Sequence, residues 1–315
     1  MAEATATVHE LQRERGLSVA AATKGDAALQ AKRKEPATVT ERNRVALDSI
    51  VAPLLAELPE PVRERWRGAE AGLKAVETLR AKIDAGGVEP AAIAAAFGAS
   101  IDTLVRFEES AQVLAVKPDV ARDMTALLRI SRTKEAAGQE RAAGAAAILL
   151  GTVGPDTRKR LMELAVEQSV RLSAYSEGAT AGQRQALDAV LADPQVRAFE
   201  QVRGRLAEGD ITGVTAESWF DLATNRIDRL HQIEELLVDE IRDTARARKT
   251  EAWSDLALFT GLTGAAMAVG ALLVLRNPRY RVPRRGGRDG ARRAGLPAAG
   301  ADRRADDRRS RASSA

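Results

Sequence analysis

Two Glu–Arg dipeptides stand in segments rich in small residues. Glu14 and Arg15 lie in "LQRERGLSVAAATKG", and Glu140 and Arg141 lie in "GQERAAGAAAILLG". On a helix the neighbours on one face are three and four positions away, and for both arginines these positions hold no carboxylate. The adjacent glutamate points about 100° away and is a poor substitute. Because burial of an unpaired charge is costly, each guanidinium needs a partner from another part of the molecule or from outside it.

Two kinds of partner fit these arginines. One is a carboxylate from a neighbouring helix. The other is an external anion held by both arginines, since the planar guanidinium fork matches a planar oxyanion through parallel hydrogen bonds. Small residues beside each arginine allow helices to approach closely and leave room for a small ligand. The residues therefore leave two arrangements open, an interhelical ion pair and a small-anion site.

The two dipeptides also indicate an internal repeat. A shift of 126 residues places Glu14 on Glu140, Arg15 on Arg141 and Gly25 on Gly151. Internal similarity at a fixed distance indicates related structural units. We therefore expect two helical units, each with a long helix that carries a Glu–Arg pair.

The elements that position these residues are expected to be helices throughout. The 315 residues are 45% apolar but only 3% aromatic, and helical periodicity recurs without convincing strand alternation. The predicted fold is all-α, with two packed helical bundles that share long helices, followed by one transmembrane helix. We expect helices over about 7–34, 39–57, 61–85, 90–115, 118–150, 157–177, 181–192, 194–208 and from about 216 into the membrane segment.

The composition argues against an enzyme or a metalloprotein. The chain has no cysteine and only two histidines, His9 and His231, so a thiolate site or a histidine-based metal site is not expected. No convergent nucleophile, base or phosphate-binding loop stands out. We therefore predict no metal site, no cofactor and no catalytic residue.

An uncharged segment near the C-terminus predicts a membrane anchor. Residues 256–275, "LALFTGLTGAAMAVGALLVL", contain no charge over 20 residues, about the length that a helix needs to cross a bilayer. Arginines follow it directly, which indicates a cytoplasmic end. A buried core helix is the alternative. We predict a single-pass protein of the cell membrane with a sensor domain at 1–250 outside, a transmembrane helix at 251–276 and a cytoplasmic tail at 277–315. The first 16 residues hold no apolar stretch typical of a signal peptide.

The C-terminal tail differs sharply in charge from the rest of the chain. Residues 276–315 hold thirteen of the 48 basic residues and four of the 44 acidic ones, leaving 35 basic and 40 acidic residues elsewhere. With almost nothing apolar to bury, the tail is predicted to be disordered and basic. It is interpreted either as a native flank or as the product of a reading-frame slip. Binding to nucleic acid or anionic lipid is conceivable for such a run, but our prediction is a membrane partner and no nucleic acid.

Three segments resemble a known family. "HELQRERGLSVAAA", "KEAAGQERAAGAAA" and "WFDLATNRIDRLHQIEELL" occur in this order before the apolar segment. Together they resemble the NIT domain, the nitrate- and nitrite-sensing domain of bacterial membrane-bound signalling proteins such as sensor histidine kinases. The resemblance covers roughly residues 8–250.

The resemblance implies a function and a set of binding residues. It implies that nitrate or nitrite is held by arginines from different helices, and Arg15 and Arg141 match the motifs best, followed by Arg13. An arginine from a later helix is also implied, and both Arg203 and Arg226 qualify.

The whole chain is then expected to be the input portion of a receptor of the histidine-kinase type, acting as a homodimer in a two-component system. Kinase motifs are absent after Leu275, so the chain itself is not expected to be an enzyme and could be a truncated kinase. The alternative function is a non-sensing helical scaffold for dimerisation at the membrane, in which Arg15 and Arg141 pair with carboxylates.

Overall fold

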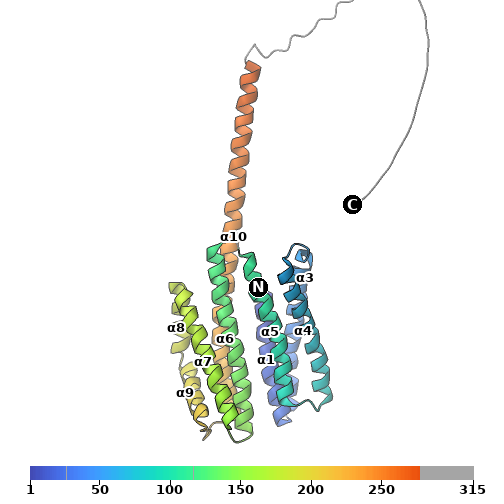
Figure 1. Cartoon of the computed structure of the whole chain (residues 1–315), viewed down its shortest axis with the longest axis vertical. Coiled ribbons are helices and arrows are strands. Elements are labelled where there is room, and N and C mark those ends of the chain that lie inside the picture. The colour runs from blue at the N-terminus through green and yellow to red at the C-terminus, as the bar shows by residue number, and fades with distance from the viewer. Residues whose placement is uncertain (26, 116, 277–315) are drawn as a thin grey trace, which may run out of the picture. The chain divides into compact units, whose positions relative to one another are not determined.

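The computed structural model describes residues 1–25, 27–115 and 117–276, and every regular element within these ranges is helical (Figure 1). The prediction of an all-α fold is confirmed. The predicted disordered tail lies outside the described residues. The elements are α1 (Ala2–Lys24), α2 (Ala27–Lys32), α3 (Lys34–Val51), the 3-10 turn η1 (Ala52–Leu54), α4 (Glu60–Ala85), α5 (Pro90–Ser110), the 3-10 turn η2 (Ala111–Leu114), α6 (Pro118–Leu149), α7 (Pro155–Gly178), α8 (Ala181–Ala192), α9 (Pro194–Glu208) and α10 (Ala216–Arg276).

The first bundle is built from α1, α3, α4 and α5, with α2 as a short connection (Figure 1). Apolar residues at three- and four-residue steps on α4 and α5 face inward and form one continuous core with α1 and α3. Trp66 of α4 packs against Phe107 of α5 within this core, with ring centroids 5.0 Å apart. Phe97, Ile101 and Leu104 of α5 are fully buried here.

The second bundle contains α6, α7, α8, α9 and the part of α10 up to Trp253. Its apolar residues form two clusters, one around Leu127, Tyr175 and Leu237, and another around Phe199 and Trp219. The two-bundle architecture predicted from the helix count is thus present.

Helices α1 and α6 join the two bundles. Gln12 of α1 contacts Glu135 of α6, and Gly16, one turn further along α1, lies against Arg141, which is six residues further along α6. Residue numbers therefore rise together on the two helices, which run in the same direction. The two repeated Glu–Arg pairs consequently stand on adjacent, parallel helices at similar heights.

The first predicted helix, over residues 7–34, is wrong in its extent. Helix α1 begins at Ala2 and ends at Lys24, and Gly25 closes it in the left-handed conformation with φ of 65°, which glycine adopts without the Cβ penalty of other residues. Pro36 does not end a helix but lies in the first turn of α3, where its missing N–H breaks no intrahelical bond.

The C-terminal apolar segment is helical, as part of α10. The chain divides into one compact unit over Met1–Trp253 and a second unit from Ser254 on. Within the described part of the second unit, Leu262–Leu273 is an apolar helical stretch. By length and composition alone, the described residues contain one helix suited to cross a membrane, Pro90–Leu114, but its apolar residues form the core of the first bundle. The predicted membrane span at 256–275 stays a prediction.

Candidate anion site between two parallel helices

Arg15 forms an ion pair with a carboxylate from another helix. Its Nη1 and Nη2 donate to the two carboxylate oxygens of Glu135 on α6, at 2.5 and 3.1 Å. Gln12 and Gln139 donate to the same carboxylate at 3.0 and 2.9 Å. Bidentate pairs of this kind are the strongest charged hydrogen bonds in proteins. For Arg15, the interhelical ion pair is the arrangement that the structure contains.

Arg141 is buried to the same depth but meets neutral partners. Its Nη1 donates to the hydroxyl of Thr224 at 2.8 Å, and its Nη2 donates to the backbone carbonyl of Gln12 at 2.8 Å. The guanidinium carbon lies 4.6 Å from the ring centre of Phe220, close enough for a cation–π contact. Among the described residues no carboxylate lies within ion-pair distance of Arg141, and its Nε has no acceptor.

The surroundings of Arg141 disfavour the positively charged form of its side chain. Burial, followed by the nearby Arg15 guanidinium, lowers the pKa of Arg141 from 12.5 to about 10. The carboxylates of Asp228 and Glu135 act in the opposite direction. Because arginine stays charged at physiological pH, the site holds a cation that its neighbours neutralise incompletely.

Each guanidinium lies against a glycine of the facing helix. A Cβ on Gly16 of α1 would lie 2.7 Å from Nη2 of Arg141, and a Cβ on Gly138 of α6 would overlap Nη2 of Arg15. The small residues around the two Glu–Arg pairs thus do allow close approach, as the sequence indicates. The space they leave is filled by the two guanidiniums themselves, which brings two cations together between α1 and α6.

The remaining predicted arginines have other partners. Arg13 pairs with Glu10 on its own helix at 2.9 Å and is 36% exposed. Arg203 and Arg226 lie together around the ring of Phe199. Both pair with Glu200, and Nη1 of Arg226 also donates to the amide oxygen of Gln168 at 2.5 Å. The structure therefore brings Arg15 and Arg141 together, and it gathers Arg203 and Arg226 in a second cluster with partners of their own.

Sequence reasoning missed three members of the site. Glu135 lies six residues before Arg141 and carries no local sign that it faces α1. Phe220 and Thr224 lie four residues apart on α10, so they share a helix face. An aromatic ring followed one helical turn later by a hydroxyl is the sequence feature that could have indicated that this face of α10 meets a polar group.

A second buried polar cluster interrupts the apolar face of α10. Glu234, which is fully buried, accepts from Lys134 at 2.5 Å and from the hydroxyl of Ser131 at 2.8 Å. His231 lies 3.2 Å from Lys134 and stacks on His9 of α1 at 3.9 Å between ring centres. Burial alone would raise the pKa of Glu234, but the Lys134 ammonium and the His231 ring together hold the pKa below its usual value. The described residues contain no group of three or more metal-binding side chains.

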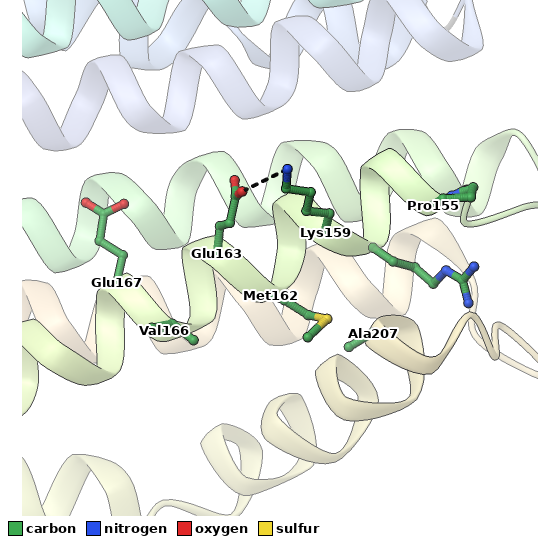
Figure 2. A pocket seen from close by; sticks show the side chains of 8 residues that line it. Pro155, Lys159, Met162, Glu163, Val166, Glu167 and Ala207 are labelled. Carbon is green, nitrogen blue, oxygen red and sulfur yellow. Dashed lines mark ion pairs between the residues drawn. The ribbon is translucent and has the colours of Figure 1, made fainter.

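Two pockets differ in whether one of the predicted arginines lines them. An open groove along α7 is lined by apolar and charged side chains, including Met162, Val166 and the Lys159–Glu163 pair (Figure 2). None of the five predicted arginines lines it. A second pocket of about 670 Å³ lies between α1, α5 and α6 and has Arg15 in its wall.

Comparison with known proteins places these features in a family. The family model described as "nitrate and nitrite sensing" matches residues 6–242. The "Nitrate regulatory protein" of Klebsiella oxytoca is 31% identical over 134 residues, which are 41% of this chain and 33% of that protein. The chain thus matches about a third of the length of this curated relative.

A solved structure is similar as well. The structure described as that of the NasR transcription antiterminator has a TM-score of 0.72 and 25% identity, and the match covers 78% of this chain and 67% of that one. The names of these relatives describe regulators, and neither names a histidine kinase or a membrane receptor. The two-component and membrane predictions gain no support from them. The match over residues 6–242 includes both Glu–Arg pairs and nearly all of the two bundles, and the chain belongs to the nitrate and nitrite sensing family.

Proposed function

We propose that this chain senses nitrate or nitrite by binding the anion at Arg141, with Arg15 as the second cationic group. The observation that carries the proposal is the state of Arg141. It is 1% exposed, it has no carboxylate partner among the described residues, and a second guanidinium lowers its pKa further. A planar anion would supply the missing negative charge and accept parallel N–H bonds.

Anion binding would act on the packing of three helices. Arg141 belongs to α6, its carbonyl acceptor Gln12 to α1, and Thr224 and Phe220 to α10. An anion that replaces the Thr224 hydroxyl or the Gln12 carbonyl as acceptor releases one helix from the guanidinium. A ligand shifts such an arrangement only by its different affinity for the two states. Helix α10 is proposed to carry the shift toward residues 256–275.

The direct test is a nitrate titration of the full chain in detergent or nanodiscs, followed by thermal melting, with chloride as the ion control. We expect nitrate at millimolar concentration to raise the melting temperature and chloride to leave it nearly unchanged. Arg141→Met should abolish the nitrate shift while the far-ultraviolet circular dichroism stays helical. Arg129→Met is the matched control, because Arg129 lies twelve residues earlier on the same helix and donates to the carbonyl of Ala174.

Two results would contradict this proposal in different ways. A wild-type chain that ignores both nitrate and nitrite is not an anion sensor. A nitrate shift of equal size in wild type and Arg141→Met places the anion elsewhere, and the cluster of Arg203 and Arg226 is then the next site to substitute.

The proposal includes a membrane anchor at 256–275, a sensor unit outside the cell, a homodimer and a role as the input portion of a receptor. The uncharged run and the arginines after it support the anchor, and Phe259, Leu262 and Met267 are exposed in the structure. Extraction of cell membranes with alkaline carbonate tests it. The chain should stay in the membrane pellet, and its release into the supernatant would overturn the anchor while leaving nitrate sensing open to its own test.

A further inference from the structure

The pocket between α1, α5 and α6 has the size and wall chemistry of a site for an organic molecule. Its volume of about 670 Å³ falls in the range of small-molecule sites. The wall is formed mainly by alanines of α5 and α6, together with Val19 of α1. Helix α5 belongs to the first bundle and α6 to the second, so the pocket lies at the interface between the two bundles.

In the described part of the chain, Arg15 has two unused hydrogen-bond donors beside this pocket, its Nε–H and one N–H of Nη1. Arg15 lines the pocket and is 1% exposed. Its Nη1 gives one N–H to Glu135, and the second N–H of that nitrogen has no acceptor among the described residues. Nη1 lies 3.7 Å from the position that a Cβ on Gly98 would take, and Gly98 is itself part of the wall. A mainly apolar wall with a few fixed polar groups is the usual way in which a site orients a small ligand.

The charges around the pocket favour a neutral ligand. Arg15 is paired with Glu135, and Arg141, which has no carboxylate partner among the described residues, does not line this pocket. The other charged residue in the wall is Glu89, which repels anions. An uncharged oxygen can still accept a spare N–H of Arg15, because hydrogen bonding needs no net charge.

We propose that this pocket binds an uncharged, mainly apolar organic molecule whose carbonyl oxygen accepts a hydrogen bond from Nη1 of Arg15. This site shares Arg15 with the proposed nitrate or nitrite site, but its ligand lies in the pocket beside α5, which Arg141 does not line. A ligand here touches α5 of one bundle and α6 of the other. It therefore biases the packing of the two bundles if its affinity differs between their arrangements.

The test compares three probes of nearly equal shape by equilibrium dialysis against the full chain in one detergent. Acetophenone is neutral and carries a carbonyl, benzoate is an anion, and ethylbenzene has no acceptor. Ala95→Trp fills the pocket from α5, and Ala99→Trp places the same ring one turn further along that helix, outside the wall. Both alanines are exposed, so neither substitution enters the core, and detergent uptake of the probes is the same for all variants.

We expect acetophenone to bind wild type and Ala99→Trp alike and to bind Ala95→Trp at least tenfold more weakly. Benzoate and ethylbenzene should each bind wild type at least fivefold more weakly than acetophenone does. Equal binding of acetophenone to both tryptophan variants would overturn the location. Tight binding of benzoate would overturn the neutral ligand class, and equal binding of ethylbenzene would overturn the role of Arg15. Nitrate melting shifts on the same samples report separately on the anion site.

Discussion

The two Glu–Arg pairs have the same sequence and parallel positions but different charge partners. In the first pair, Glu14 accepts two hydrogen bonds from Arg80, at 2.8 and 2.7 Å, and the Arg33 guanidinium lies 3.8 Å away. Arg15 of the same pair forms an ion pair with Glu135. In the second pair, Glu140 accepts from the amide of Gln168 at 2.7 Å, with the Arg203 guanidinium at 3.8 Å. Arg141 meets a hydroxyl, a carbonyl and a ring.

The difference between the pairs shows how a repeat can supply both a scaffold and a site. The first pair is neutralised within the protein, and it fixes α1 to α4 and α6. The second leaves one buried cation without an anion in the described structure. Since a buried charge without compensation is unfavourable, the second pair is the one that gains most from an external anion.

The largest predicted effect separates the two arginines by stability alone. Arg15→Met leaves Glu135 as a buried carboxylate without its cation and should lower the free energy of unfolding by about 3–5 kcal/mol. Arg141→Met removes a cation that lacks a counter-ion, so we expect a change within about 1 kcal/mol of wild type without nitrate. Urea unfolding at neutral pH, followed by circular dichroism, measures both.

The double variant Arg15→Met/Glu135→Leu is the control for this comparison. It should recover most of the loss, because replacing both members of a buried ion pair by apolar groups is often nearly neutral. If Arg141→Met were as damaging as Arg15→Met, the contrast between the two pairs would be wrong.

A buried carboxylate in the first bundle gives the next prediction. Glu108 of α5 accepts from the hydroxyl of Thr5 at 2.8 Å, and burial raises its pKa from 4.5 to about 7. The folded state therefore binds this proton more strongly than the unfolded state. Stability from this group is fully present below pH 4.5 and is lost as the pH rises through 7. We expect a loss of about 2–3 kcal/mol between these values.

Glu108→Gln should remove this pH dependence, because an amide does not titrate between pH 4.5 and 7. Parallel urea unfolding of both proteins at intervals across this range measures it. The prediction also sharpens the comparison of the bundles, since a buried acid can take up a proton whereas Arg141 stays charged. An identical slope in wild type and Glu108→Gln would show that other groups carry the pH dependence.

Much of the fold was predictable because its signals are local. Most helices begin and end where the sequence indicates, since proline at the first turn and glycine after the last act on the nearest backbone groups. The C-terminal end of α1 was predicted too late, just before Pro36. Proline interrupts a helix only when it lies in the helix interior, and Pro36 lies in the first turn of α3. Helix α1 ends earlier, at the left-handed Gly25. A glycine or a proline is compatible with the end of one helix or the start of the next, and tertiary packing decides which of these forms.

The site was predictable only in part, because ion pairing depends on which helices face each other. The sequence indicates that Arg15 and Arg141 need partners from elsewhere, and this follows from helix geometry. It does not indicate that Glu135 faces Arg15 while Thr224 faces Arg141, since these contacts join residues 120 and 83 positions apart. Contacts between side chains so far apart in the sequence leave no pattern in the residues near either partner.

A smaller effect concerns the glutamates of the two pairs. Glu14→Gln leaves buried Arg33 and the partly buried Arg80 with less negative charge and should cost about 3 kcal/mol of unfolding free energy. Glu140→Gln replaces an acceptor whose hydrogen-bond donor is a neutral amide, and should cost about 1 kcal/mol. Thermal melting of the two variants side by side measures the difference. Equal losses would mean that Arg203, despite its 3.8 Å distance, neutralises Glu140 as fully as Arg80 neutralises Glu14.

The smallest predicted effect is that of Arg13, which the sequence ranks directly after Arg15 and Arg141. Its pair with Glu10 is three residues away on the same helix and is partly exposed, so Arg13→Gln should change stability by less than about 0.5 kcal/mol. Because salt screens partly exposed charges at physiological ionic strength, the variant should also keep nitrate affinity within about twofold of wild type. Calorimetric titration with nitrate measures the affinity. A tenfold loss would place Arg13 in direct contact with the anion, on the side of α1 where the structure shows only its pair with Glu10.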